Sequence, residues 1–371
     1  MPTAITRGAA SAKAFGFTSG TGGVGYKYMG QATSSGSFYW GNTAAEVASN
    51  NNMITATGIS NMWTYDTYAA AGVVNDGQFI GTRGGYSRNN GATWTAAAPY
   101  NFYNSYYQQF TSGGVDGGIA YSKTTKAYGF FSTGYDGKYN QWYYYVNVIP
   151  TTGSTNTYGL SFGSSPSYRM KQVLYWPLYD AFLVNATGWP YALYANSTTG
   201  HSTLNTQGGT TQGGQRWCID PSSGYLYYND GLTIYSTNDI SFATVSYVGS
   251  DISGSYNWAY QSTPIKGPGG YWYKTADTTS GTTYYCTVYI SDNTNYPVNW
   301  TQVGQVYTGY MYQGHPSLFW DSASNTLYLT CLFYVSGSYG GPFWFTQSST
   351  NGGSTWNTTS NAKMAMTKNF T

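Results

Sequence analysis

The feature that most constrains the fold of this chain is an octapeptide that occurs twice. Both copies read Ser-x-Asn-x-Gly-x-Thr-Trp, at residues 87–94 and 349–356. Asn can hydrogen-bond the backbone ahead of it, Gly supplies a positive φ, the hydroxyls satisfy local amides, and the Trp ring packs on the sheet. The pattern predicts two structural hairpin turns, built by Ser87, Asn89, Gly91, Thr93 and Trp94 and by Ser349, Asn351, Gly353, Thr355 and Trp356.

This octapeptide resembles the Asp-box of sialidase-like β-propellers, with Asn in place of the usual Asp in both copies. In that family the box joins the outer strands of a blade and lies away from the active face. The resemblance covers eight residues twice, with degraded copies at 236–242 and 291–300. It therefore implies an architecture rather than an activity.

A second pattern is a turn residue followed, two positions later, by a large apolar residue inside a predicted strand pair. Its apolar positions are Phe79, Tyr128, Phe182, Leu226, Trp272 and Leu327, spaced by 49, 54, 44, 46 and 55 residues. Four-stranded propeller blades repeat at about this length. The spacing predicts an all-β, six-bladed β-propeller, with seven blades as the alternative because residues 26–72 could hold a seventh blade or a closing strand. The competing interpretation is low-complexity sequence that imitates a repeat.

Composition agrees with an all-β fold and excludes several functions. The chain has 42 Tyr, 48 Gly and 13 Trp but only 8% charged residues and a net charge of +2. Aromatic residues favour strands. Because Lys and Arg do not cluster and no apolar run is long enough to span a bilayer, we expect neither nucleic-acid binding nor membrane insertion. Three widely spaced Cys and two His predict no disulfide framework, no metal site and no cofactor.

The first 25 residues are small and Gly-rich and cannot build a core. We expect residues 1–25 to be a flexible attachment arm, or else a disordered tail, and residues 26–371 to form the propeller. The amino-acid sequence of the arm resembles the leader sequences of virion proteins from tailed phages. That resemblance implies partners among other virion proteins and an oligomeric assembly.

The catalytic residues of sialidases are a poor match to this chain. That family uses a Tyr nucleophile paired with Glu, an acid/base Asp and three arginines. Here Glu46 is the only Glu, only five arginines exist, and none lies in the family's Arg-Ile-Pro motif. A general glycosidase needs two facing carboxylates, and five aspartates have no assigned turn role: Asp66, Asp116, Asp180, Asp251 and Asp277. We expect no enzymatic activity, with a propeller-type glycoside hydrolase as the alternative.

The repeat register places several basic and amide residues at or near the starts of innermost strands, where propellers usually bind ligands. They are Arg169, Lys171, Gln215, Arg216, Lys266 and His315. We expect them to bind an acidic or neutral glycan, the alternative being ordinary solvated positions on the rim. Tyrosine clusters at 100–107 and 142–145 are a second candidate surface. The sequence thus predicts a virion surface protein: a phage tail-fibre or tail-tip adhesin that binds host glycans, or a decoration protein without a host ligand.

Overall fold

The computed structural model of the protein describes most of the chain from residue 28 to residue 368. The described ranges are 28–32, 37–48, 53–55, 74–76, 79–81, 85–96, 105–109, 119–136, 141–151, 158–162, 170–186, 189–194, 201–203, 217–230, 232–252, 262–309, 316–333, 343–360 and 364–368. The predicted arm at 1–25 lies outside these ranges, so the arm and its boundary stay predictions. In the described part, no helix is both long and apolar enough to cross a membrane.

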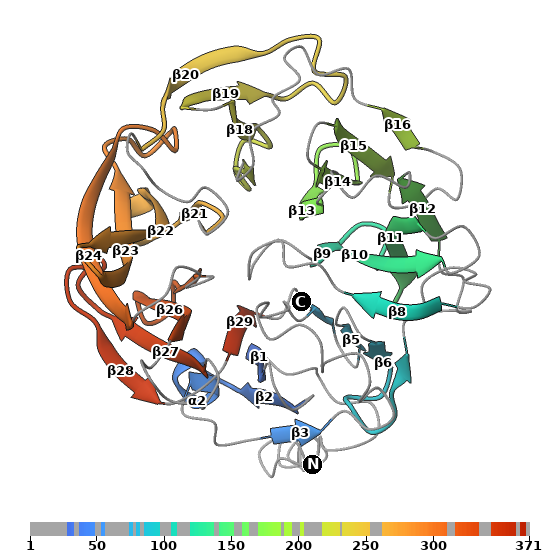
Figure 1. Cartoon of the computed structure of the whole chain (residues 1–371), viewed down its shortest axis with the longest axis horizontal. Helices are drawn as coiled ribbons and strands as arrows, with labels where there is room; N and C mark the ends of the chain where they lie inside the picture. The colour runs from blue at the N-terminus through green and yellow to red at the C-terminus, as the bar shows by residue number, and fades with distance from the viewer. Residues whose placement is uncertain are drawn as a thin grey trace, which may run out of the picture.

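The described residues form seven antiparallel sheets arranged in a ring (Figure 1). The sheet made from both ends of the chain has the order β29 (Met364–Lys368), β1 (Tyr28–Ala32), β2 (Ser37–Gly41) and β3 (Met53–Thr55). The next sheet consists of β4 (Val74–Asp76), β5 (Phe79–Gly81), β6 (Gly85–Ser87) and β7 (Thr95–Ala96). The third contains β8 (Ser105–Gln109), β9 (Ile119–Ser122), β10 (Ala127–Asp136), β11 (Gln141–Pro150) and β12 (Tyr158–Phe162).

The other four sheets follow one another along the chain and repeat one up-and-down order. Their strands are β13 (Met170–Trp176), β14 (Ala181–Ala186), β15 (Trp189–Tyr194) and β16 (His201–Thr203); β17 (Cys218–Ile219), β18 (Leu226–Asp230), β19 (Thr233–Thr237) and β20 (Ser246–Ser250); β21 (Ile265–Lys266), β22 (Trp272–Ser280), β23 (Thr283–Ser291) and β24 (Trp300–Gly309); and β25 (Ser317–Asp321), β26 (Thr326–Phe333), β27 (Phe343–Ser349) and β28 (Asn357–Ser360). Helical structure among the described residues is confined to α2 (Ala44–Ala48) and the 3₁₀ turn η3 (Pro268–Gly270).

The fold is the all-β propeller that the sequence predicts. The six repeat units lie in six different sheets. The described residues form seven sheets, which is the alternative that the sequence left open, and the seventh combines β1–β3, within residues 26–72, with β29 from the other end of the chain. In it, β29 pairs antiparallel with β1, from Tyr28 opposite Lys368 to Ala32 opposite Met364. This pairing supplies the inner strand of the sheet and closes the ring, and it covers the edge of β1 that would otherwise be the inner edge of the sheet.

Hydrophobic clusters lie mainly between neighbouring sheets. One joins the last two sheets through Tyr273, Cys286, Val288 and Val306 on one side and Leu318, Leu327, Leu329 and Cys331 on the other. Another joins β13–β16 to β17–β20 through Trp176, Leu183, Trp217, Leu226 and Phe242. Because burial occurs between blades, each blade depends on its neighbours for much of its stabilisation.

Both predicted box turns form, and their hydrogen bonds match. In the second, Ser349 Oγ donates to Asn351 Oδ1 (2.8 Å), Thr355 N donates to the same oxygen (3.0 Å), and Asn351 Nδ2 donates to Thr355 Oγ1 (2.8 Å). The corresponding distances at Ser87, Asn89 and Thr93 are 2.9, 2.9 and 2.8 Å. Gly91 and Gly353 have φ of 85° and 89°. Trp94 and Trp356 each donate Nε1 to the carbonyl of the box glycine.

One degraded box lies one residue further along than the sequence register predicts. Thr237 ends β19 in the position of the box Ser, and Asp239, rather than Asn238, accepts the hydrogen bonds of the turn. Its Oδ1 accepts from Ser241 N at 2.9 Å and from Ser241 Oγ at 2.7 Å. The predicted box at Ser291 and Asn293 does form, and it follows β23.

Candidate functional site

Of the six predicted ligand-binding residues, Lys266 is the one whose side chain the structure describes. Lys171 is the second residue of the innermost strand β13, in agreement with a position near a strand start. The structure does not describe Arg169, Gln215, Arg216 or His315. A ring formed by the six residues therefore stays a prediction.

Lys266 is the second residue of the two-residue strand β21, so its position is also near a strand start. It is the last residue of β21 and pairs with Trp272 across the turn 267–271. Just before β21, the N–H of Ser262 donates to the carbonyl of Thr275 in β22. In an antiparallel blade, the turn after the first strand lies at the same end as the box turn after the third. Lys266 is therefore on the end of the ring that carries the boxes.

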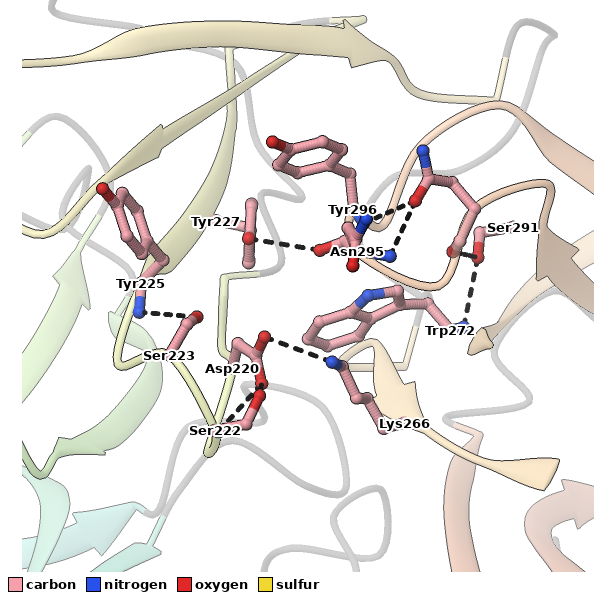
Figure 2. Close-up of polar contacts among 11 residues, drawn as sticks. Asp220, Ser222, Ser223, Tyr225, Tyr227, Lys266, Trp272, Ser291, Asn295 and Tyr296 are labelled. Carbon is pink, nitrogen blue, oxygen red and sulfur yellow. Dashed lines mark hydrogen bonds and ion pairs between the residues drawn. The ribbon is translucent and has the colours of Figure 1, made fainter. Parts of the chain in front are cut away.

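An ion pair connects Lys266 to the preceding blade (Figure 2). Lys266 Nζ lies 3.2 Å from Asp220 Oδ2, and the side chains are 26% and 6% exposed. Asp220 follows β17 and accepts hydrogen bonds at Oδ1 from Ser222 N (2.9 Å) and Ser222 Oγ (2.6 Å). Burial raises the pKa of Asp220, but the bonds from Ser222 and Lys266 outweigh it and leave that pKa below its usual value. Asp220 is therefore held as a carboxylate.

Aromatic rings from both blades surround this pair. Tyr227 packs edge-on against Trp272 and Tyr296, with ring centroids 5.7 and 6.1 Å apart. Its hydroxyl donates to the carbonyl of Asn295 at 3.2 Å, and Lys266 Nζ lies 5.2 Å from the centroid of the Trp272 ring. Figure 2 shows Tyr225 and Tyr296 on either side of Tyr227. Tyr227 and Trp272 are buried, whereas Tyr225 and Tyr296 are 38% and 39% exposed. We call Tyr225, Tyr296 and Lys266 the tyrosine–lysine surface.

The degraded box after β23 positions Tyr296. Ser291 Oγ accepts from Trp272 N at 3.1 Å and donates to the carbonyl of Asn293 at 2.6 Å. Asn293 Oδ1 accepts from the backbone N–H of Asn295 (2.7 Å) and of Tyr296 (3.3 Å). The two extra residues that precede Trp300 let this turn carry an aromatic side chain. The sequence shows this insertion, but an insertion that weakens the box motif does not by itself indicate a site at Tyr296.

A buried ion pair lies beside this surface and joins the same two blades. Lys274 Nζ contacts Asp251 Oδ1, and Asp251 also accepts from Asn229 Nδ2 at 3.1 Å and from Ile252 N at 2.7 Å. Lys274 lies 4.6 Å from the centroid of the Trp300 ring. Burial lowers the pKa of Lys274, although Asp251 acts in the opposite direction. Both side chains line a cavity of about 10 Å³, room for about one water.

Two of the five aspartates that have no assigned turn role make structural hydrogen bonds. Asp251 belongs to the buried pair, and Asp180 accepts from Tyr175 Oη (3.0 Å), Ser122 Oγ (2.5 Å) and Thr125 Oγ1, which ties β13–β14 to the preceding blade. Asp277 is buried, and Asp66 and Asp116 lie outside the described residues. The tyrosine clusters at 100–107 and 142–145 fall partly in β8 and β11, and the structure does not describe their side chains. Within the described ranges, no group of His, Cys, Asp and Glu is placed to hold a metal ion.

Comparison with known proteins finds similarity only among solved structures, since no family model and no curated protein matches the chain. Trypanosoma rangeli sialidase in complex with sialic acid is 11% identical with a TM-score of 0.44, and the match covers 78% of this chain and 55% of that one. The dihydro-heme d1 dehydrogenase NirN is 11% identical with a TM-score of 0.40, covering 86% and 57%. An exo-β-1,3-galactanase from Clostridium thermocellum is 13% identical with a TM-score of 0.36, covering 70% and 64%. The match thus spans less than two thirds of each of these proteins.

These similarities concern the fold, and at TM-scores below 0.5 they carry no argument about a ligand or a reaction. They do correct one expectation from the sequence, that the protein is not an enzyme. Most of the similar structures are glycoside hydrolases, among them the sialidase, the galactanase, a GH62 hydrolase and a fructan 1-exohydrolase. Poor agreement with the sialidase residues concerns one reaction and does not bear on enzymatic function as a whole.

Proposed function

We propose that this propeller interacts with carbohydrate and that the tyrosine–lysine surface contacts the sugar. The observation that carries the proposal is the pair of partly exposed rings, Tyr225 and Tyr296, which neighbouring blades present on either side of Tyr227, together with the Lys266–Asp220 ion pair that joins the same two blades. Aromatic rings offer a rigid apolar face with a polar hydroxyl at its edge. A sugar ring has the complementary chemistry, an apolar C–H face bordered by hydroxyls.

We propose further that this binding takes place on a virus particle, with the protein as a phage tail adhesin. Support for that setting comes from the sequence: the Gly-rich first 25 residues suit attachment to another virion protein, and a chain with only 8% charged residues suits neutral polar partners. The same features suit a decoration protein without a host ligand. The two roles differ in whether the tyrosine–lysine surface is open or covered in the assembled particle.

Glycan-array binding followed by calorimetry on the full chain tests the carbohydrate proposal. The double variant Tyr225→Ala/Tyr296→Ala should weaken binding by about tenfold or more, since each lost stacking contact is worth roughly 1 kcal/mol. Tyr247→Ala is the matched control, because Tyr247 is 65% exposed on the outer strand β20, away from Lys266. It should leave the affinity unchanged.

Three outcomes would alter the proposal. Absence of binding to any glycan would overturn it, and equal losses in the double variant and in Tyr247→Ala would remove the assigned surface. Release of free sugar from a bound glycan would show a hydrolase and would direct the search to carboxylates elsewhere on the ring. A map of the assembled particle in which Tyr225 and Tyr296 are covered by a neighbouring subunit would contradict the adhesin role.

A further inference from the structure

We infer that the tyrosine–lysine surface selects uncharged sugars and discriminates against carboxylated ones, because Asp220 already neutralises its only cation among the described residues. This inference rests on the proposed function and adds the class of ligand. A lysine without a paired carboxylate would instead favour an acidic glycan. The argument depends on how the hydrogen-bonding capacity of Lys266 and of Asp220 is used.

Lys266 keeps a donor for a ligand. Its ammonium group has three N–H donors; one is directed to Asp220 Oδ2, and the group also lies over the Trp272 ring. The side chain is 26% exposed, so solvent reaches it. A hydroxyl of a sugar that reaches Lys266 can accept this remaining bond without any change in the local charge.

The side chain of Asp220 is much less accessible to a ligand than that of Lys266. Its side chain is 6% exposed, and its oxygens accept from Ser222 and Lys266. Its role is to position and neutralise Lys266. A ligand carboxylate would therefore meet a cation whose charge is already balanced by a fixed anion, and would lose its own hydration for little electrostatic gain.

Removal of the Asp220 charge should reverse this preference. Asp220→Asn keeps an oxygen that can accept from Ser222, but it leaves Lys266 unpaired and available to an anionic sugar. Asp239→Asn is the matched control. Asp239 accepts from Ser241 N and Oγ as Asp220 does from Ser222, so the variant removes the same charge from a similar turn in the same blade.

The experiment measures binding of the full chain to probe pairs in which a carboxylate is free or methyl-esterified: 3′-sialyllactose against its methyl ester, and free against methyl-esterified oligogalacturonate. We expect the wild type and Asp239→Asn to prefer the neutral member of a pair by about tenfold, and Asp220→Asn to lower that preference to below about threefold. Thermal unfolding of each variant checks that the fold is retained.

The results separate this inference from the proposed function. If no probe or arrayed glycan binds, the proposed function fails and the inference with it. If sugars bind but the wild type prefers the carboxylated member, or if Asp220→Asn and Asp239→Asn shift the preference equally, the inference is overturned while carbohydrate binding stands. A greater loss of preference in Asp220→Asn than in Asp239→Asn supports it.

Discussion

Single amide and carboxylate side chains determine how the turns of this propeller are built. Asn351 acts as acceptor and donor at once, which explains why Asn replaces the usual Asp of the box: its Nδ2 bonds Thr355 Oγ1 while its Oδ1 receives Ser349 Oγ and Thr355 N. At Asp220 the same turn chemistry has a second use, because the oxygen not bonded to Ser222 fixes a lysine of the next blade. One residue thus shapes a turn and sets the electrostatics of the candidate site.

Substitution of the box asparagine tests this account. Asn351→Ala removes three hydrogen bonds at the surface and should lower the free energy of unfolding by about 1–2 kcal/mol, measured by urea denaturation. Asn89→Ala should cost a similar amount, since Asn89 makes the same bonds at nearly the same lengths. Asn351→Asp should cost less than half as much, because the Thr355 hydroxyl can turn to donate. An aspartate as damaging as alanine would contradict the assigned bonding.

Strands and turns show what could be predicted from the sequence. The repeat predicted six sheets because each begins with a hairpin whose turn and apolar positions lie close together in the chain. The repeat does not mark the seventh sheet, for which the sequence offered only the alternative at residues 26–72, because its inner strand β29 and its partner β1 come from opposite ends of the chain. Tyr296 was missed because it lies in an insertion that weakens the box motif.

A cross-sheet contact at the ring closure predicts a pH dependence. Tyr28 in β1 donates its hydroxyl to Asp321 of β25 at 2.8 Å. Burial raises the pKa of Tyr28 to about 12, and the bond to Asp321 acts in the same direction. From pH 10 to pH 12 the unfolded chain loses this proton while the folded chain retains it, so the stabilisation, complete below pH 10, declines as pH rises.

Tyr28→Phe isolates this contribution. The variant should be less stable than the wild type by about 1 kcal/mol at pH 8, for loss of the hydrogen bond. The difference in urea midpoint should shrink between pH 10 and pH 11, since phenylalanine does not titrate. Tyr247→Phe, at an exposed tyrosine, should show a difference that does not change with pH. A constant difference for Tyr28→Phe as well would show that Tyr28 ionises normally.

At the scale of the whole molecule, stability depends on contacts between blades and on closure of the ring. The three cysteines are free and buried, so no disulfide joins the blades. Closure depends on the pairing of β29 with β1, and the largest clusters lie between sheets. A ring of this kind loses a core interface on both sides of any blade that opens. We therefore expect it to unfold as one unit, unlike an open repeat array.

The cysteines allow cooperative unfolding to be measured blade by blade. Cys218, Cys286 and Cys331 lie in β17, β23 and β26 of three consecutive sheets and are 3%, 0% and 0% exposed. In the folded protein all three should resist a thiol reagent, and in rising urea they should become reactive with one common midpoint, followed site by site by mass spectrometry. A chain ended at Ser360 lacks β29, and its common midpoint should fall because β1 loses its partner. If Cys331, next to the opened sheet, becomes reactive well before Cys218, the blades unfold one at a time and closure is not what makes the ring cooperative.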